Sequence, residues 1–309
     1  MKRRAFLVAA GASLLGACAG SGVSFPFSSG TGRPRLLMPR LACDSHIHIF
    51  DPRFPARPGW PGTPVDNATV EVYRGFQRRI GTSRAVVVTP STYGIDNSAT
   101  LDALAQFGGA ARAVAVIDSD APSDDLRQMA QAGVVGLRVN FVSPQVWGRT
   151  NTRRLRATAR IAADHGWHVQ VYAPGETIRE IEQELRDIEA PLVIDHLGYV
   201  RSDKSEDGAG VASLLRLLAG GRTWLKLSGA YISSLTGPPD YEDLNHIARR
   251  FVASAPERLV WGSDWPHRGQ AGRWPDDARL ADLLMDWIDD EAVRRAVLVD
   301  NPGRLYGFD

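Results

Sequence analysis

The feature that most constrains the fold of this 309-residue chain is an alternation of strand-like and helix-like segments that repeats eight times. Near-continuous β-branched runs, such as residues 84–90, are typical of parallel strands that are buried on both faces. Segments with apolar residues at helical spacing, such as 211–218, follow them. Eight strands that each precede a helix predict an α/β fold, a (β/α)8 TIM barrel, rather than an open doubly wound sheet.

The predicted elements fill the chain in order and leave no room for a second domain, so we expect residues 37–309 to form one barrel. Strands are expected at residues 41–50, 84–90, 111–117, 134–141, 168–173, 191–196, 223–228 and 258–262. Helices are expected at residues 69–80, 97–107, 124–131, 152–165, 176–189, 211–218, 244–253 and from 278 onward. No glycine-rich phosphate loop follows a strand, which argues against nucleotide binding.

The first residues have the pattern of an export signal. A basic start that includes Arg3 and Arg4 precedes the uncharged segment 5–17, which is too short to span a bilayer but fits the apolar region of a signal peptide. The two arginines resemble a twin-arginine signal, and Cys18 ends a lipobox-like sequence that would place a lipid on it. Residues 1–18 therefore predict export to the periplasm, with a lipid anchor at Cys18. An ordinary secretory signal with a chance cysteine is the alternative.

The composition excludes several classes of protein. Residues 19–36 are rich in Gly, Ser and Pro and predict a flexible tether. Hydrophobic residues make up 44% and charged residues 23% of the chain, as in ordinary soluble domains. The formal net charge is +1 and no basic run is present outside the leader, so no nucleic-acid partner is expected. The oligomeric state has no sequence signature.

The first predicted strand carries two histidines on one face. His46 and His48 alternate with Ile47 and Ile49, and the strand period of two sends both imidazoles to the same side. There they can bind a metal or polarise a substrate carbonyl, although an isolated His-x-His is equally compatible with two incidental histidines. By the same alternation, Cys43 is expected to pack under a helix, opposite the histidines.

Polar side chains lie on or directly after seven of the eight predicted strands. In a TIM barrel the carboxyl ends of the strands meet at one mouth, where the chemistry takes place. The sequence therefore predicts an active site for a small molecule at this mouth. Its candidates are His46, His48, Ser91, Thr92, Tyr93, Arg138, Asn140, His168, Gln170, Tyr172, Asp195, His196, Lys226, Ser228, Asp264 and His267.

Five motifs together resemble the amidohydrolase superfamily. They are His-x-His-x-Phe-Asp-Pro at 46–52, Val-Ile-Asp-His-Leu-Gly at 193–198, Trp-Leu-Lys-Leu-Ser-Gly at 224–229, Trp-Gly-Ser-Asp-Trp-Pro-His at 261–267 and Asn-Pro-Gly-Arg-Leu-Tyr-Gly at 301–307. Within the superfamily they look like the amidohydrolase-related branch that contains 2-pyrone-4,6-dicarboxylate lactonase and sugar lactonases. The resemblance implies a hydrolase that opens a lactone or a related cyclic ester.

The resemblance also implies roles for individual residues. The catalytic set that it implies is His46, His48, His196 and Asp264. Two residues match positions that contact substrate, and two more from the eighth strand are candidate pocket walls: Arg138, Tyr172, Trp265 and His267.

This chain departs from the metal-dependent members of the superfamily at two positions. Many of them carry a histidine at the end of strand five and a bridging lysine on strand four, where this chain has Gln170 or Tyr172 and Arg138. A binuclear centre is therefore not expected. The dicarboxylate lactonase also has a second arginine after the strand-four arginine, but residues 141–145 supply none, which argues against a dicarboxylate substrate.

The expected mechanism is hydrolysis without a cofactor. Asp264 takes a proton from water as general base, the three histidines polarise the attacked carbonyl, and Arg138 anchors a substrate carboxylate or hydroxyl. A single zinc ion held by the three histidines and Asp264 is the alternative that the sequence leaves open. Two other functions also remain open: a metal-dependent decarboxylase or C–C hydrolase acting on a small aromatic acid, and a non-catalytic exported binding protein.

Overall fold

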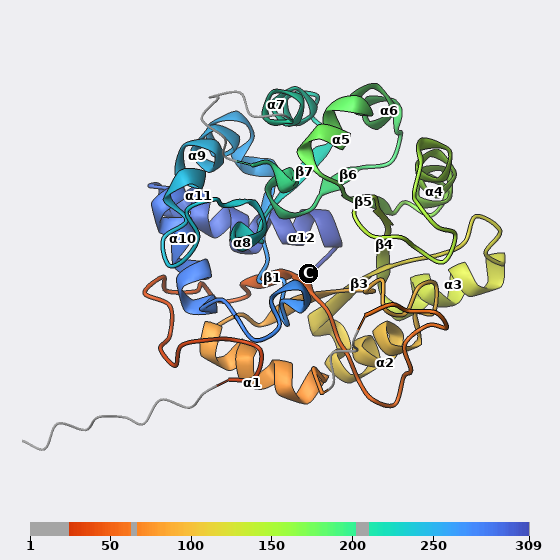
Figure 1. Cartoon of the computed structure of the whole chain (residues 1–309), viewed down its shortest axis with the longest axis horizontal. Coiled ribbons are helices and arrows are strands. Elements are labelled where there is room, and N and C mark those ends of the chain that lie inside the picture. The colour runs from red at the N-terminus through yellow and green to blue at the C-terminus, as the bar shows by residue number, and fades with distance from the viewer. Residues whose placement is uncertain (1–24, 63–66, 202–209, 309) are drawn as a thin grey trace, which may run out of the picture.

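The computed structural model describes residues 25–62, 67–201 and 210–308. Within these residues, eight parallel strands form one sheet in sequence order (Figure 1). The predicted strands are confirmed; each is shorter than expected, and β1 and β6 have half the expected length. They are β1 (Cys43–Ile47), β2 (Arg84–Val88), β3 (Ala111–Ala115), β4 (Val134–Asn140), β5 (His168–Tyr172), β6 (Leu192–Ile194), β7 (Thr223–Leu227) and β8 (Leu259–Trp261).

Helices surround the sheet on its outer side (Figure 1). They are α1 (Val70–Ile80), α2 (Ser98–Phe107), α3 (Ser123–Ala132), α4 (Thr152–Asp164), α5 (Gly175–Glu180), α6 (Glu182–Asp187), α7 (Val211–Ala219), α8 (Ala230–Ser233), α9 (Asn245–Ser254), α10 (Asp277–Trp287), α11 (Glu291–Arg295) and α12 (Asn301–Tyr306). In the described part of the chain, none of them is both long and apolar enough to cross a membrane.

Two helical regions differ from the prediction. The single helix expected at 176–189 is two short helices, α5 and α6, because the backbone of Ile181 leaves the helical conformation with φ −105° and ψ 19°. The sequence also gave no sign of the one-turn helix α8, which follows β7 directly. A helix of four residues is too short to show a hydrophobic period.

The barrel closes because the residues after β8 pair with β1. The backbone N–H of Asp264 donates to the carbonyl of His46 at 2.9 Å, and the N–H of His48 donates to the carbonyl of Trp265 at 2.8 Å. The hydrogen bonds that close the barrel therefore also hold the two predicted histidines next to the predicted base.

An irregularity in the pairing of β1 follows Asp44 and changes which side chains face the barrel interior. Cys43 packs inside the barrel, and His46 and His48 also face inward. Asp44 points outward, where Tyr73 of α1 donates to its carboxylate at 3.1 Å. The prediction that Cys43 packs under a helix was therefore wrong, because a bulge breaks the alternation of a regular strand.

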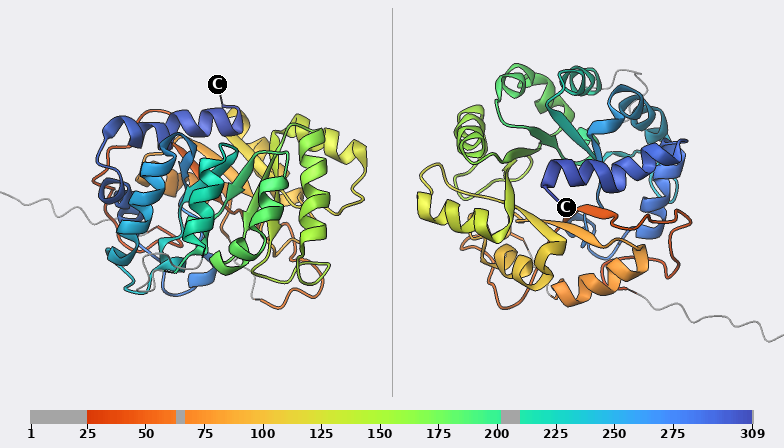
Figure 2. Two further views of the ribbon diagram at one scale, coloured as in Figure 1. Left: turned by 90° about the horizontal axis from the view of Figure 1, so that it is seen from above. Right: turned by 180° about the vertical axis from the view of Figure 1, so that it is seen from behind.

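A layer of apolar side chains fills the barrel interior behind the predicted site. We call this layer the barrel floor; it consists of Cys43, Val86, Val88, Val114, Val260, Tyr306 and Phe308. The view from behind in Figure 2 shows the C-terminal helical region lying across this end of the barrel. The floor is thus a closed core rather than an opening.

The segment 25–36 is fixed against the barrel, which differs from the flexible tether predicted for residues 19–36. Arg79 of α1 donates to the carbonyl of Gly32 at 2.7 Å and to the hydroxyl of Ser28 at 2.8 Å. The ring of Phe27 packs edge-on against Trp265 at 5.5 Å. The composition argument overlooked these anchoring residues. The predicted signal and the first part of the tether lie outside the described residues.

Candidate active site

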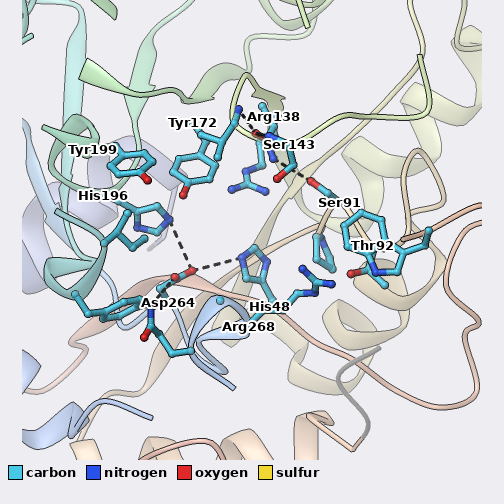
Figure 3. A pocket seen from close by; sticks show the side chains of 18 residues that line it. His48, Ser91, Thr92, Arg138, Ser143, Tyr172, His196, Tyr199, Asp264 and Arg268 are labelled. Atoms are coloured by element: carbon cyan, nitrogen blue, oxygen red, sulfur yellow. Dashed lines mark hydrogen bonds and ion pairs between the residues drawn. The ribbon is translucent and has the colours of Figure 1, made fainter. Parts of the chain in front are cut away.

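A cavity of ≈ 340 Å³ opens at the carboxyl ends of the strands. Its walls come from strands and loops at this end of the barrel, as a TIM barrel predicts. Figure 3 shows these side chains pointing into a common space. The lining residues are His48, Trp60, Pro90, Ser91, Thr92, Arg138, Asn140, Val142, Ser143, Tyr172, His196, Tyr199, Tyr231, Ile232, Asp264, Arg268, Gly269 and Gln270.

Three imidazoles converge on one carboxylate oxygen of Asp264. Its Oδ1 lies 3.5 Å from Nε2 of His46. The same oxygen lies 3.5 Å from Nε2 of His48 and 3.7 Å from Nε2 of His196 (Figure 3). Asp264 and His196 both have positive φ values, 64° and 52°. Such strained turns occur directly after β8 and β6, where they aim the two side chains into the mouth.

Two of the imidazoles are also held through Nδ1, the ring nitrogen that faces away from Asp264. Nδ1 of His48 lies 2.7 Å from the backbone oxygen of Val88, which can only accept, so Nδ1 carries the proton. A neutral His48 therefore turns an unprotonated Nε2 toward Asp264. Nδ1 of His196 lies 2.9 Å from the hydroxyl of Ser228, which can donate or accept, so either tautomer of His196 fits.

The donor atoms of this cluster fit one divalent cation. Nε2 of His48 faces Nε2 of His46 at 3.3 Å and the Asp264 carboxylate at 3.5 Å. Tetrahedral zinc with bonds of roughly 2.0–2.1 Å holds its ligand atoms about 3.3–3.4 Å apart. These three residues match that spacing, and His196 lies beside them. The outer hydrogen bond of His48 is also typical of a metal-binding histidine.

A buried lysine lies beneath the histidines. The Nζ of Lys226 is 2.9 Å from the carbonyl of Ser45, 2.8 Å from the side-chain oxygen of Gln170 and 3.2 Å from Nδ1 of His46. Burial lowers the pKa of Lys226 to about 8, although nearby Asp195 acts in the opposite direction. Burial and the charge of Lys226 together lower the pKa of His46 well below its usual value, which keeps this imidazole neutral.

Asp195 is a buried carboxylate beside His46 and Lys226. Its Oδ1 lies 3.3 Å from Nδ1 of His46 and 3.5 Å from Nζ of Lys226. Gln170 donates to its Oδ2 at 3.1 Å. Burial alone would raise the pKa of Asp195, but His46 and Lys226 outweigh burial and hold the pKa well below its usual value. Asp195 is therefore ionised and orients His46.

The second carboxylate oxygen of Asp264 ends a chain of buried hydrogen bonds. Tyr231 donates to Oδ2 of Asp264 at 2.5 Å, and Nδ1 of His267 lies 3.0 Å from the Tyr231 hydroxyl. Nε2 of His267 lies 3.0 Å from the carboxylate of Asp277. Burial lowers the pKa of His267, but Asp277 outweighs it and the pKa is raised. A protonated His267 donates to both neighbours, which leaves the Tyr231 proton for Asp264.

These contacts keep Asp264 ionised. Burial would raise its pKa, but the surrounding histidines, His196 most strongly, outweigh burial and hold the pKa of Asp264 well below its usual value. An ionised carboxylate in a pocket is the form that can accept a proton or bind a cation.

Arg138 and Tyr172 lie in the cavity wall, where the sequence placed them. The guanidinium of Arg138 lies over the Tyr172 ring, 5.3 Å from its centroid. Its NH2 is 3.5 Å from Asp195. The Tyr172 ring also meets His196 edge-on at 5.2 Å. Both side chains therefore border the space in front of the histidine cluster (Figure 3).

Trp265 and His267 are not among the residues that line this cavity, although the sequence analysis named both as pocket walls. The ring of Trp265 points outward and packs against Tyr73 and Phe76 of α1 at 5.4 and 5.9 Å. His267 is fully buried behind Tyr231. Trp265 follows a sharp turn after β8, where Asp264 has a positive φ of 64° and points inward while Trp265 points outward.

Several residues of the site received no role from the sequence. Asp195 and Lys226 were among the polar strand-end residues, but only the fold shows that they pair with His46. Tyr231 belongs to the unpredicted helix α8 and gave no signal. The loops after β1 and β8 add Trp60 and Arg268, which belong to none of the five motifs.

Comparison with known proteins agrees with the fold and the site. A sequence model described as "Amidohydrolase" matches residues 43–308. D-galactarolactone isomerase of Agrobacterium fabrum is 36% identical over 281 residues, which cover 90% of this chain and 94% of that protein. The 2-pyrone-4,6-dicarboxylate hydrolase of Comamonas testosteroni is 33% identical over 284 residues, which cover 89% of this chain and 92% of that protein.

A solved structure shows the same architecture. The crystal structure of an Agrobacterium tumefaciens protein in its apo form matches with a TM-score of 0.81 and 36% identity, covering 89% of this chain and 99% of that one. The resemblance inferred from the five motifs is thereby confirmed. The chain belongs to the amidohydrolase family, as an enzyme of the branch that includes these lactone-converting relatives.

Proposed function

We propose that the mouth of the barrel hydrolyses a lactone, with Asp264 as the general base. The observation that carries this proposal is the ionised Asp264 carboxylate, which lies in the cavity wall with Oδ1 surrounded by three imidazoles. The relatives support the substrate class, because galactarolactone and 2-pyrone are both cyclic esters.

The proposed reaction moves one proton through Asp264. A water molecule attacks the lactone carbonyl carbon, and Asp264 takes a proton from that water as the new C–O bond forms. The bond between the carbonyl carbon and the ring oxygen then breaks, and Asp264 returns the proton to the ring alkoxide. The products are one carboxylic acid and one hydroxyl on the same molecule. A positioned base of this kind contributes typically ~10²- to 10⁴-fold.

Tyr231 and Arg138 have supporting roles in this reaction. The hydroxyl of Tyr231 holds Oδ2 of Asp264, which leaves Oδ1 turned toward the imidazoles. Arg138 presents a planar guanidinium to the cavity and anchors a carboxylate or hydroxyl of the substrate. His196 can still donate from Nε2, because its Nδ1 partner is a hydroxyl.

The donor geometry supports a single divalent cation rather than the metal-free site that the sequence favoured. The neutral form of His48 carries its proton on Nδ1 and has none on Nε2 to donate to a substrate oxygen, so this form fits a cation better than a carbonyl. His46, His48 and Asp264 would hold the ion, with His196 beside it. When bound, the cation would polarise the carbonyl and lower the pKa of water.

Metal analysis of the purified protein tests this part of the proposal. We expect about one divalent ion per chain, and loss of activity on treatment with a chelator that is reversed by adding the ion back. Full activity in protein that contains no metal would restore the metal-free mechanism.

Lactone isomerisation is the second candidate, because the relative with 36% identity is named for it. The same base serves if a hydroxyl of the substrate, instead of water, attacks the carbonyl. A decarboxylase or C–C hydrolase is tested by the same assays with small aromatic acids. Membership of an enzyme family argues against a non-catalytic binding protein.

A screen of lactones and cyclic esters with a pH indicator tests the proposed class directly, because ring opening releases an acid. We expect turnover of at least one lactone with a polar or acidic substituent. Turnover of aromatic acids alone, with release of carbon dioxide, would contradict the proposal.

We also propose that the enzyme works outside the cytoplasm, anchored through Cys18. The support is the basic, apolar and lipobox-like order of residues 1–18. Cell fractionation tests it: the full chain is expected in the membrane fraction, and Cys18→Ser is expected to release it. A chain that stays in the cytoplasm would contradict the proposal.

A further inference from the structure

One charged side chain in the cavity wall has no role in the proposed reaction. Arg268 lines the cavity and is half-buried, yet its side chain makes no hydrogen bond or ion pair with any described residue, and its Nε is fully buried. Burial lowers the pKa of Arg268, and no carboxylate opposes this effect. The half-buried Arg279 is the contrast, because Asp286 and Asp240 raise its pKa despite burial.

The protein holds Arg268 in place although no acid pairs with it. Its guanidinium lies over the ring of Trp60, 4.5 Å from the centroid. A Cβ at Gly62 would come within 2.4 Å of the Arg268 guanidinium, so the glycine leaves room for the guanidinium in this position. A cation–π contact fixes the direction of a guanidinium but does not neutralise its charge. Arg268 is therefore oriented and uncompensated.

Two uncharged side chains in the wall of the same cavity also have buried polar atoms without a hydrogen-bond partner. The indole Nε1 of Trp60 and the hydroxyl of Thr92 are both buried without a hydrogen-bond partner in the structure. Both residues line the same cavity as Arg268. Figure 3 shows Thr92 and Arg268 on the side of His48 away from His196 and Tyr199. Buried polar groups are normally paired, so unpaired donors that border one cavity call for an acceptor from a ligand.

We propose that Arg268, Trp60 and Thr92 form a subsite for an anionic group of the substrate, separate from Arg138. Guanidinium, indole and hydroxyl groups are all donors, and a carboxylate or a similar oxyanion accepts from several donors at once. The inference rests on the proposed function for its substrate. It deepens that function, because the lactone would then carry two anionic groups, one at Arg138 and one at Arg268.

This subsite changes the expectation drawn from the sequence. The missing arginine in residues 141–145 argued against a dicarboxylate. In the fold, Arg268 from the loop after β8 supplies the second positive charge. The sequence does not show this, because Arg268 is far from residues 141–145 along the chain.

Anion binding tests the subsite without requiring turnover. Isothermal titration calorimetry would compare acetate, sulfate, malonate and succinate on the wild-type protein, on Arg268→Gln and on Arg57→Gln. Arg57 is the matched control, because its guanidinium also lies over Trp60, at 5.2 Å, but it does not line the cavity. Thermal unfolding and circular dichroism verify that each variant is folded.

We expect the wild-type protein to bind at least one dicarboxylate more tightly than acetate. Arg268→Gln should weaken that binding about 10- to 100-fold, the usual loss for a charged hydrogen bond, and Arg57→Gln should leave it unchanged. Equal binding by Arg268→Gln and wild type would overturn the subsite, and so would a wild-type protein that does not prefer any dianion. Because binding needs no catalysis, failure of the lactone screen would leave this result intact.

Discussion

The two ends of the barrel interior are built from the same strands but have opposite chemistry. The floor is an apolar layer that includes Val86 of β2 and Val260 of β8, closed by Tyr306. At the mouth, a few residues further along the chain, the strand ends present ionised Asp264 and the histidines. A parallel barrel thus separates stability from chemistry along each strand, and a change at one end should leave the other unaffected.

Between the two ends lies a layer of buried charges. Lys226 and Asp195 are both fully buried, with Nζ and Oδ1 3.5 Å apart, and Gln170 bonds to each of them. Burying two charges is costly unless they are paired and hydrogen-bonded. The charges of Lys226 and Asp195 stabilise each other. Both residues also contact Nδ1 of His46 and hold this imidazole in place.

The largest effect is expected at the mouth. Asp264→Asn replaces the base by a near-isostere that cannot accept a proton, so kcat/KM should fall by ~10²- to 10⁴-fold. The melting temperature should change little, because the amide oxygen still accepts from Tyr231. Steady-state kinetics and thermal unfolding on the same preparation measure both. A variant that keeps near wild-type turnover would show that the base assignment is wrong.

A smaller effect is expected at Tyr231, which contacts the base directly. Tyr231→Phe removes the hydrogen bond to Oδ2 of Asp264, so kcat should fall about 10- to 100-fold while KM changes little. Tyr199→Phe is the control, because Tyr199 lines the cavity and stacks on Tyr172 at 6.1 Å without a bond to Asp264. Equal losses in both variants would mean that Tyr231 acts only as part of the wall.

The smallest effect on activity is expected at the floor. Val260→Ala removes two buried methyl groups and should lower the free energy of unfolding by about 1–3 kcal/mol. Its kcat/KM at 25 °C should match that of the wild type. Chemical denaturation and kinetics together measure the contrast with the mouth. Loss of activity in a folded Val260→Ala protein would show that the two ends are coupled.

The sequence predicted the barrel and a polar mouth from local patterns, and the resemblance to the amidohydrolase superfamily selected the four central residues from the polar candidates. Apolar runs predict strands, and in a barrel the residues that follow the strands lie together at the mouth. It failed at Cys43 and Trp265, where a bulge or a sharp turn decides which face a side chain takes. Neither event leaves a signature in residue type or spacing.

The sequence also could not predict contacts that join distant loops. Arg268 and Trp60 lie far apart in the chain, and only the closed barrel brings their side chains together. The same holds for His267 and Tyr231, which come from the β8 loop and from a helix too short to predict. The composition of residues 25–36 also wrongly predicted a flexible tether. The hydrogen bonds from Arg79 and the packing of Phe27 on Trp265 hold this segment against the barrel, although it is rich in small residues.

The central claim is that water attacks the lactone carbonyl at the mouth of the barrel. Mass spectrometry of the product formed in H₂¹⁸O tests it most directly, with a substrate found in the lactone screen. Hydrolysis predicts one ¹⁸O atom in the new carboxylate, from wild-type protein and not from Asp264→Asn. An isomeric lactone without ¹⁸O would contradict the claim and show that a substrate hydroxyl, not water, is the nucleophile.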